Sequence, residues 1–224
     1  MYSIAIDGPS GAGKSSLAKE LSKRLSILYV DTGAIYRTVG YFAKINEINP
    51  DDENTLSQNF DKINIKLEWC DGAQRIYLNG EDVSEKIRTP EMSMYASKVS
   101  APPSVRAFLL DMQRNFAKEN SVLMDGRDIG TVVLPDANVK IFLVANEVSR
   151  AKRRVAELLQ KGQNVTLEEV LSDMKIRDKN DSQRKTAPCT PADDAIIFDN
   201  SEYTFEETVE KALEIINEKL NETV

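Results

Sequence analysis

The sequence predicts an α/β fold: a five-stranded parallel sheet flanked by helices, with a small antiparallel β insert and a helical lid. Three observations predict it. Short apolar runs alternate with helical patterns, one internal segment alternates in hydrophobicity residue by residue, and a basic segment follows the fourth apolar run. With 224 residues, 41% of them hydrophobic, the chain is long enough for one large domain or a core with an insert.

Five apolar runs are the candidate strands of the parallel sheet. They are too apolar to alternate between a buried and an exposed face, which is typical of strands buried on both sides. Helical periodicity follows most of them; after the first run, leucines recur at Leu17, Leu21 and Leu25. The runs are Tyr2–Asp7, Leu28–Asp31, Val122–Asp125, Val139–Ala145 and Ala195–Asp199.

The insert lies between the second and third runs. Ile63–Trp69 and Gln74–Leu78 each alternate in hydrophobicity, and Asp71-Gly72 and Asn79-Gly80 are typical turn dipeptides. We therefore expect a short antiparallel meander. Two helical patterns follow it, divided at Pro102-Pro103 because a helix interior tolerates proline poorly.

The chain contains no histidine and two cysteines, Cys70 and Cys189. Without histidine there can be no Ser-His-Asp or Cys-His nucleophile, no histidine general base and no histidine-ligated zinc. Two cysteines cannot supply a four-thiolate metal site, and we expect both to be reduced thiols. The chemistry must then rest on carboxylates, lysine, arginine, hydroxyls, backbone amides and a borrowed metal.

The charge is unevenly distributed along the chain. Lys and Arg number 29 against 36 Asp and Glu, a net charge of −7, yet residues 149–185 carry ten basic and six acidic side chains. This segment is either a pair of solvated helices or a cradle for an anionic ligand. The N-terminus lacks a signal-peptide pattern and no apolar stretch could span a membrane, so we expect a cytoplasmic protein, monomeric by default.

A phosphate-binding motif follows the first apolar run. Residues Gly8 to Ser15 read G-x-x-x-x-G-K-S, with a strand pattern before them and a helical pattern after. The glycines let successive backbone N–H groups point at one phosphate, where the helix N-terminus adds partial positive charge. Lys14 can reach the β- and γ-phosphates, and the Ser15 hydroxyl can ligate Mg²⁺. The fold is therefore predicted to be P-loop NTPase-like.

The motif alone does not name the reaction, because GTPases, motor ATPases and small-molecule kinases share it. No N-K-x-D base-reading motif is present and the chain is short for a motor, so small-molecule kinases are favoured. They need a cationic site for an acceptor. Candidates near the ends of predicted elements are Arg37, Arg106, Asp125, Arg127 and Asp128. For each of them a cap, a turn or a solvated surface is the alternative.

The basic segment adds further candidates. Arg177, Asp181 and Arg184 are spaced so that they share one face of a helix. One interpretation is an intrahelical salt-bridge ladder. The other is that these arginines close over a nucleotide and neutralise the transferred phosphoryl group, together with Arg150, Arg153 and Arg154 on the preceding helix.

A series of short motifs runs through the chain from end to end. They are Ile6–Ser15, Asp31–Arg37, Asn79–Ser84, Ile87–Pro90, Ala96-Ser97, Val105-Arg106, Asp125–Val133, Arg177-Asp178 with Asp181 and Arg184, and Asp194-Ala195. Together they resemble bacterial cytidylate kinase, the (d)CMP kinase of the nucleoside monophosphate kinase group. The phosphate loop is shared with many families, whereas the later motifs are specific to this one.

The resemblance implies an ATP-dependent kinase that phosphorylates CMP or dCMP. ATP would bind at Gly8, Pro9, Ser10, Gly11, Ala12, Gly13, Lys14, Ser15 and Ser16. Mg²⁺ would be held, through water, by Ser15 and Asp125. The catalytic side chains would be Lys14, Arg127, Arg153 and Arg184. The acceptor would be bound by Thr32, Arg37, Ser97, Arg106, Arg127, Asp128, Arg177, Asp181 and Arg184.

Within that set, the resemblance implies separate tasks. The CMP phosphate would be held by Arg37 and Arg127 with help from the lid, and Arg184 would bridge toward the phosphates. Cytosine would be read by Ser97, Arg106 and Asp128, and the sugar contacted by Arg177 and Asp181.

The same resemblance implies three regions. They are a core ATP-binding domain of residues 1–31, 104–148 and 186–224, a monophosphate-binding region with the β insert at 32–103, and a lid at 149–185.

Three other functions are open. UMP or GMP could be the acceptor of a related kinase. A switch that only binds ATP would not need the many arginines beyond the loop. A nucleic-acid binder is disfavoured by the acidic total and by the lack of an aromatic stacking series in the basic segment.

Overall fold

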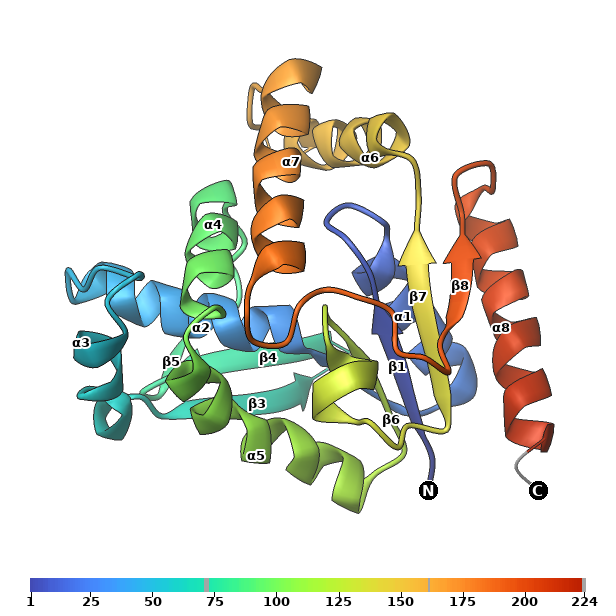
Figure 1. Ribbon diagram of the computed structural model, residues 1–224, viewed down its shortest axis with the longest axis horizontal. Helices are drawn as coiled ribbons and strands as arrows, with labels where there is room; N and C mark the ends of the chain where they lie inside the picture. Colours follow the sequence, from blue (N-terminus) through green and yellow to red (C-terminus); the bar gives the residue numbers. More distant parts are fainter. Residues whose placement is uncertain (71–72, 161, 223–224) are drawn as a thin grey trace. The chain divides into compact units, whose positions relative to one another are not determined.

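The structure, a computed structural model, describes residues 1–70, 73–160 and 162–222 (Figure 1). Its backbone contacts divide the chain into two compact units. Unit 1 comprises Met1–Tyr29 and Asn120–Val224, and unit 2 comprises Val30–Glu119. The three regions expected from the sequence stay a prediction.

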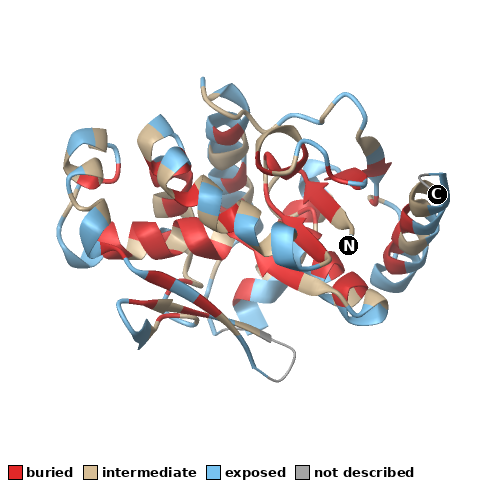
Figure 2. Ribbon diagram, turned by 90° about the horizontal axis from the view of Figure 1, so that it is seen from below, coloured by how far each residue is buried: buried red, intermediate tan, exposed pale blue. Residues whose placement is uncertain are grey.

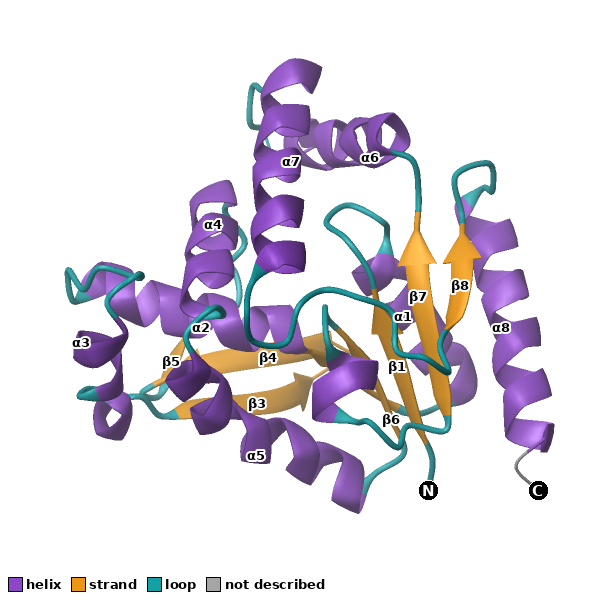
Figure 3. Cartoon of the chain, viewed as in Figure 1, coloured by secondary structure: helices purple, strands orange, loops and turns teal. Residues whose placement is uncertain are grey.

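Unit 1 carries most of the parallel sheet and the helices around it (Figure 3). Its elements are β1 (Ser3–Asp7), α1 (Lys14–Leu25), β2 (Leu28–Asp31, which continues into unit 2), β6 (Val122–Asp125), a π-helical turn (Ile129–Val133), β7 (Val139–Val144), α6 (Glu147–Gln160), α7 (Leu167–Gln183), β8 (Ile196–Asp199) and α8 (Phe205–Glu222). In the part of the chain that the structure describes, the strand order is β2-β6-β1-β7-β8. The prediction of a five-stranded parallel sheet is confirmed, with each strand within about one residue of its apolar run.

The centre of the sheet is buried: β1 has a parallel neighbour on each side, and helices cover the side chains on its faces. Ile4 lies opposite Leu123 of β6 and Val139 of β7. All three side chains belong to one core cluster, to which α1 and α8 add their apolar stripes, such as that of Leu17 and Leu21. Figure 2 shows these strands as buried. The sheet thus holds the carboxyl ends of its strands, and the loops that follow them, on a rigid base.

Helices α6 and α7, called the lid helices here, span the segment that was predicted to be a lid and lie beyond the carboxyl end of β7 (Figure 1). Their role as a lid stays a prediction. They share a small core of their own, made of Ala151, Leu158, Val170 and Met174. A capping box between Thr166 and Glu169 fixes the start of α7. A side chain at Gly11 would come within 2.8 Å of the Met174 methyl group, so α7 lies directly over the loop after β1.

Unit 2 contains the antiparallel insert and four helices among its described residues. Its elements are α2 (Thr32–Ile45), α3 (Glu53–Ser57), a 3₁₀ turn (Phe60–Lys62), β3 (Ile65–Cys70), β4 (Ala73–Leu78), β5 (Glu81–Asp82), α4 (Pro90–Val99) and α5 (Pro103–Glu119). The meander is confirmed, and Asn79-Gly80 forms a two-residue hairpin turn with φ of 52° and 87°. The turn expected at Asp71-Gly72 lies outside the described residues.

The proline pair divides two helices as expected. α4 ends at Val99 and α5 begins at Pro103, where the missing N–H of proline costs no helical hydrogen bond. α2 and α4 approach so closely at Gly40 that an added Cβ would lie 2.9 Å from the Tyr95 Cβ. Throughout the described ranges, no helix combines the length and the apolarity that a membrane crossing requires.

Candidate active site

The phosphate loop occupies the turn between β1 and α1, in the strand–loop–helix context that the motif requires. Gly8 has φ of 143°, and a Cβ there would lie 2.1 Å from the Leu143 carbonyl oxygen. Gly13 caps α1 with φ of 95°. Both positions therefore require glycine, which lets the loop curl at the helix N-terminus.

Lys14 is buried inside this loop. Its Nζ donates a hydrogen bond to the Pro9 carbonyl oxygen, 2.7 Å away, which holds the amine across the curl of the loop. Burial lowers the pKa of Lys14 to about 7, with a further lowering from Arg127 and a partial offset from Asp125. A phosphate in the loop would supply the negative charge that this buried amine lacks.

Ser15 and Asp125 form a pair suited to Mg²⁺. The Ser15 hydroxyl donates to Asp125 Oδ2 at 2.8 Å, and the Tyr29 hydroxyl donates to Oδ1 at 2.8 Å. Asp125 ends β6, where a carboxylate can face the loop. Among the residues described, no cluster of three or more His, Cys, Asp and Glu side chains could hold a metal. Two hard oxygen ligands therefore fit an ion shared with nucleotide phosphates and water.

Two ion pairs join the segment after β6 to the end of α7. Arg127 Nε donates to Asp181 Oδ2 at 2.9 Å, and Arg184 Nη2 donates to Asp128 Oδ1 at 3.2 Å. Burial alone would raise the pKa of Asp181, but the neighbouring guanidinium groups, led by Arg127, outweigh it and lower that pKa. The structure thus brings together four residues that were predicted to contact the acceptor.

Arg184 is not on the helical face where the spacing placed it. Arg177 Nε and Asp181 Oδ2 lie 3.9 Å apart on α7, as the spacing predicts. The helix ends at Gln183, however, and Arg184 has an extended backbone with φ of −63° and ψ of 142°. Arg184 therefore reaches Asp128 from the loop that follows the helix.

The lid contacts the phosphate loop directly. Asp178 of α7 accepts a hydrogen bond from the Ser10 backbone N–H at 2.9 Å, and Arg150 of α6 donates to Asp178 at 2.5 Å and to the Ser10 carbonyl oxygen at 2.7 Å. Arg177 Nη1 donates to the Ser10 hydroxyl at 3.3 Å. Arg153 donates to Asn200 and, at 3.4 Å, to the Ala12 carbonyl oxygen. Arg150, Arg153 and Arg177 thus gather around the loop, whereas Arg154 pairs with Glu157 of its own helix at 2.6 Å.

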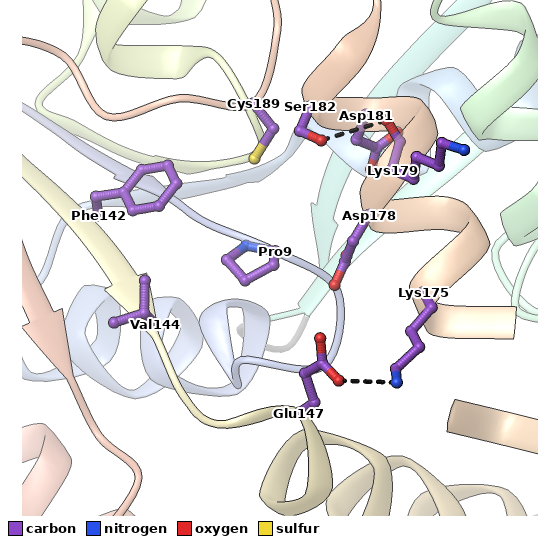
Figure 4. Close-up of a pocket in the computed structure, with 10 residues that line it drawn as sticks. All are labelled: Pro9, Phe142, Val144, Glu147, Lys175, Asp178, Lys179, Asp181, Ser182 and Cys189. Carbon is purple, nitrogen blue, oxygen red and sulfur yellow. Dashed lines mark hydrogen bonds and ion pairs between the residues drawn. The ribbon is translucent and has the colours of Figure 1, made fainter. Parts of the chain in front are cut away.

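A pocket of about 440 Å³ opens beside the loop, between α7 and the end of β7 (Figure 4). Phe142 and Val144 provide its apolar wall. Asp178 and Asp181 line it from α7. Space therefore remains next to the phosphate loop even though the lid touches it.

In unit 2, a carboxylate at the end of β2 holds two arginines. Asp31 caps α2 by accepting the Ala34 N–H, and its Oδ2 accepts hydrogen bonds from Arg37 at 3.0 Å and Arg88 at 2.7 Å. Burial opposes its charge, but the two guanidinium groups lower the pKa of Asp31 to about 2. A Cβ at Gly33 would lie 3.2 Å from Arg37 Nη1, so glycine leaves room for this guanidinium over the first turn of α2.

The residues expected to read cytosine lie on consecutive elements of the chain. Ser97 is buried on α4 and Arg106 on α5. The Arg106 guanidinium donates to the Ser100 carbonyl oxygen at 3.2 Å and lies over the Tyr36 ring, 5.5 Å from its centroid. Thr32 is the buried first residue of α2. Asp128, the third expected base contact, belongs to unit 1, and its joint role with Ser97 and Arg106 stays a prediction.

Comparison with known proteins assigns the chain to a family. The family model described as cytidylate kinase matches residues 4–218. The chain belongs to the cytidylate kinase family. A cytidylate kinase of Caldicellulosiruptor bescii is 49% identical over 212 residues, which cover 95% of this chain and 94% of that protein. A cytidylate kinase of Thermosipho melanesiensis is 47% identical over 216 residues, covering 96% and 97%.

A solved structure also resembles this member of the cytidylate kinase family. It is an uncharacterized protein from Eubacterium ventriosum, with a TM-score of 0.50, 14% sequence identity and 99% of each chain covered. At that identity, the likeness concerns the fold alone.

Sequence reasoning gave no role to three residues that the structure places in or beside the site of this cytidylate kinase family member. Asp178 contacts the phosphate loop, Arg88 contacts Asp31, and Asp7 binds the segment after β6. All three lie inside stretches that resemble the family, and Asp7 and Asp178 directly adjoin Gly8 and Arg177, which have expected roles. That adjacency was the available signal, whereas their partners are distant in sequence.

Proposed function

We propose that the protein transfers the γ-phosphoryl group of ATP to CMP or dCMP, giving ADP and CDP or dCDP. One observation carries the proposal: in a chain of the cytidylate kinase family, a complete phosphate loop lies in the same unit as the Arg127–Asp181 and Arg184–Asp128 pairs. A protein that only binds ATP has no use for such a second cationic set.

ATP binds at the phosphate loop in this proposal. Backbone N–H groups between Gly8 and Ser16 surround the β-phosphate, and Lys14 reaches across the β- and γ-phosphates. The hydroxyl of Ser15 and the carboxylate of Asp125 hold Mg²⁺, in part through water. The ion, when bound, neutralises charge that develops on the transferred group.

The acceptor is held by guanidinium groups and read by buried polar side chains. Arg37 and Arg127 take the phosphate of CMP, and Thr32, which begins the same helix as Arg37, also contacts the acceptor. Ser97, Arg106 and Asp128 read cytosine through donors and acceptors on its polar edge. Arg177 and Asp181 contact the sugar, and Arg184 bridges toward the phosphates.

The transfer needs positioning and charge neutralisation rather than proton abstraction. The bond between the γ-phosphorus and the bridging β–γ oxygen breaks while a phosphate oxygen of CMP bonds to the same phosphorus in line. Because that acceptor oxygen is already anionic, no general base is required. The negative charge on the phosphoryl group during transfer is stabilised by Lys14, Arg127, Arg153 and Arg184. This agrees with a chain that has no histidine.

A coupled assay of ADP release with ATP and a panel of monophosphates tests the proposal. We expect turnover with CMP and dCMP, and a much lower kcat/KM with UMP and GMP. Arg106→Met should lower the ratio of kcat/KM for CMP to kcat/KM for UMP, because the site loses a hydrogen-bond donor that distinguishes cytosine from uracil. ADP release that is independent of any acceptor would instead indicate an ATP-binding switch.

We also propose that the enzyme works as a monomer in the cytoplasm, where nucleoside monophosphates are made and consumed. In the proposal, every phosphate-binding and base-reading group comes from one chain. Light scattering behind size exclusion should give a mass close to the chain's 25.1 kDa. A stable dimer would contradict this part of the proposal.

A further inference from the structure

One buried carboxylate of unit 1 has no task in the proposed reaction. Asp7, the last residue of β1, is 5% exposed. Its Oδ1 accepts the backbone N–H of Ile129 at 2.8 Å, and its Oδ2 accepts that of Gly130 at 2.7 Å. Both donors begin the π-helical turn after β6. One side chain therefore satisfies two consecutive backbone groups more than a hundred residues away in the sequence.

A third hydrogen bond ties the other end of the same segment to β1. The Gly126 N–H donates to the Ile6 carbonyl oxygen at 3.0 Å. The segment 126–130 is thus fixed to β1 at both ends. Arg127 and Asp128 are the two residues between the fixed points. Their backbone has little freedom to move as long as both ends are held.

The space around Gly130 is also confined. An added Cβ at Gly130 would lie 3.1 Å from Cδ of Lys140 and 3.5 Å from Oδ2 of Asp7. Lys140 is itself buried, and its Nζ donates to Asp194 at 2.9 Å. The space where a Gly130 side chain would stand is therefore already filled by the methylene chain of Lys140, beside the Asp7 carboxylate.

We propose that Asp7 is a positioning residue that fixes Arg127 and Asp128 for the acceptor nucleotide. This inference rests on the proposed function. Asp7 directly precedes Gly8, so the residue that leads into the phosphate loop also sets the segment assigned to CMP. The Asp7 side chain thereby fixes Arg127 and Asp128, which are assigned to CMP, relative to the phosphate loop, which is assigned to ATP.

The chemistry of the contact requires a carboxylate. Two N–H donors need two acceptor oxygens, and an amide side chain of the same shape offers only one. Burial raises the pKa of Asp7 to about 6, although the N–H groups of Gly130 and Ile129 partly offset it. Above that pH the group is ionised and accepts both bonds.

The test compares Asp7→Asn with wild type in steady-state kinetics and direct ATP binding. We expect kcat/KM for CMP to fall by about tenfold to a hundredfold, because small displacements of positioned groups have effects of that size. The Kd for ATP should stay within about twofold of wild type, since the phosphate loop is intact. Asp136→Asn, the same charge change at an exposed residue after the turn, should leave both constants unchanged.

Hydrogen exchange supplies a readout that does not depend on turnover. In Asp7→Asn, the amides of Ile129 and Gly130 should exchange faster, while those of α8 keep the wild-type rate. Unchanged exchange and an unchanged kcat/KM for CMP would overturn the inference, as would equal losses for ATP and CMP.

A second variant keeps the inference testable if Asp7→Asn does not fold. Gly130→Ala pushes the segment away from Lys140 with the carboxylate intact, and it should also lower kcat/KM for CMP while sparing ATP binding. Normal CMP kinetics in that variant would contradict the inference. Wild-type protein that fails to phosphorylate CMP would contradict the proposed function instead, and the exchange experiment would still test the role of Asp7.

Discussion

The carboxylate of Asp178 accepts a hydrogen bond from the backbone N–H of Ser10, 2.9 Å away. A lid helix therefore places a negative charge on the loop that is built to bind phosphate. Arg150 bonds both to this carboxylate and to the Ser10 carbonyl oxygen, which closes a small network between α6, α7 and the loop. The contact between lid and loop is thus made of polar bonds that a nucleotide can compete with.

Asp178→Asn should loosen the lid in the nucleotide-free protein. A hydrogen bond to a charged group contributes about 1.5–3 kcal/mol, so the lid helices should open about tenfold to a hundredfold more often. Hydrogen exchange across α7, or tryptic cleavage at its basic residues, measures this opening. Asp173→Asn on the exposed face of α7 is the matched control and should behave like wild type. Equal hydrogen exchange across α7 in the two variants would indicate that Asp178 does not hold this helix on the phosphate loop.

Lys14→Met should lower kcat for CMP by about a hundredfold or more, because one charged donor to the transferred phosphoryl group is lost. Burial lowers the pKa of Lys14 to about 7, so the charged amine is costly in the nucleotide-free protein. The free energy of unfolding should therefore be unchanged or higher. Assay and calorimetry check the two effects, with Lys19→Met on the exposed side of α1 as control. Normal turnover by Lys14→Met would exclude phosphoryl transfer at this loop.

Ser15→Ala should raise the Mg²⁺ concentration needed for half-maximal activity severalfold. The variant removes a hydroxyl oxygen that lies 2.8 Å from Asp125, so the ion keeps only one protein partner of the pair. Activity should recover partly at high Mg²⁺. Titrating Mg²⁺ at fixed ATP measures the shift, and Ser22→Ala on the same helix serves as control. An unchanged Mg²⁺ requirement would remove Ser15 from the metal site.

The stability of the protein should depend on pH through Asp7. Burial raises the pKa of Asp7 from 3.8 to about 6, so between these values the folded protein binds more protons than the unfolded chain. Its free energy of unfolding should therefore fall as pH rises through this window, by up to about 3 kcal/mol relative to Asp7→Asn. Urea unfolding of both proteins from pH 4 to 6 measures the difference. A constant difference would mean that Asp7 titrates normally.

The fold was predictable from the sequence because its signals are local. Apolar runs mark the strands of the parallel sheet, Asn79-Gly80 marks a hairpin, and Pro102-Pro103 separates two helices. Each depends on the backbone preferences or burial of a few neighbouring residues. The phosphate loop was found for the same reason, since strand, glycines and helix are contiguous.

Contacts within the site were less predictable because their partners are distant in sequence. Nothing local to Tyr29 indicates that its hydroxyl meets Asp125, and nothing local to Asp178 indicates Ser10. Spacing placed Arg184 on α7, but a helix boundary one residue earlier moved it into the following loop. Residue types and approximate places could be inferred, whereas their pairing required the fold.

The pairs Arg127–Asp181 and Arg184–Asp128 have a consequence for how nucleotides arrive. Opposite charges about 3 Å apart have a field that dies away faster than that of a lone cation, well within the screening length of salt. Residues 149–185 keep a net positive charge, ten basic against six acidic side chains, but Arg127 and Arg184 themselves add little long-range pull on anions because a carboxylate matches each of them. These two arginines should therefore contribute little to the salt dependence of the nucleotide association rate. Arg127 and Arg184 therefore act on a nucleotide only at short range, when its phosphate comes close enough to replace the carboxylate that each arginine contacts.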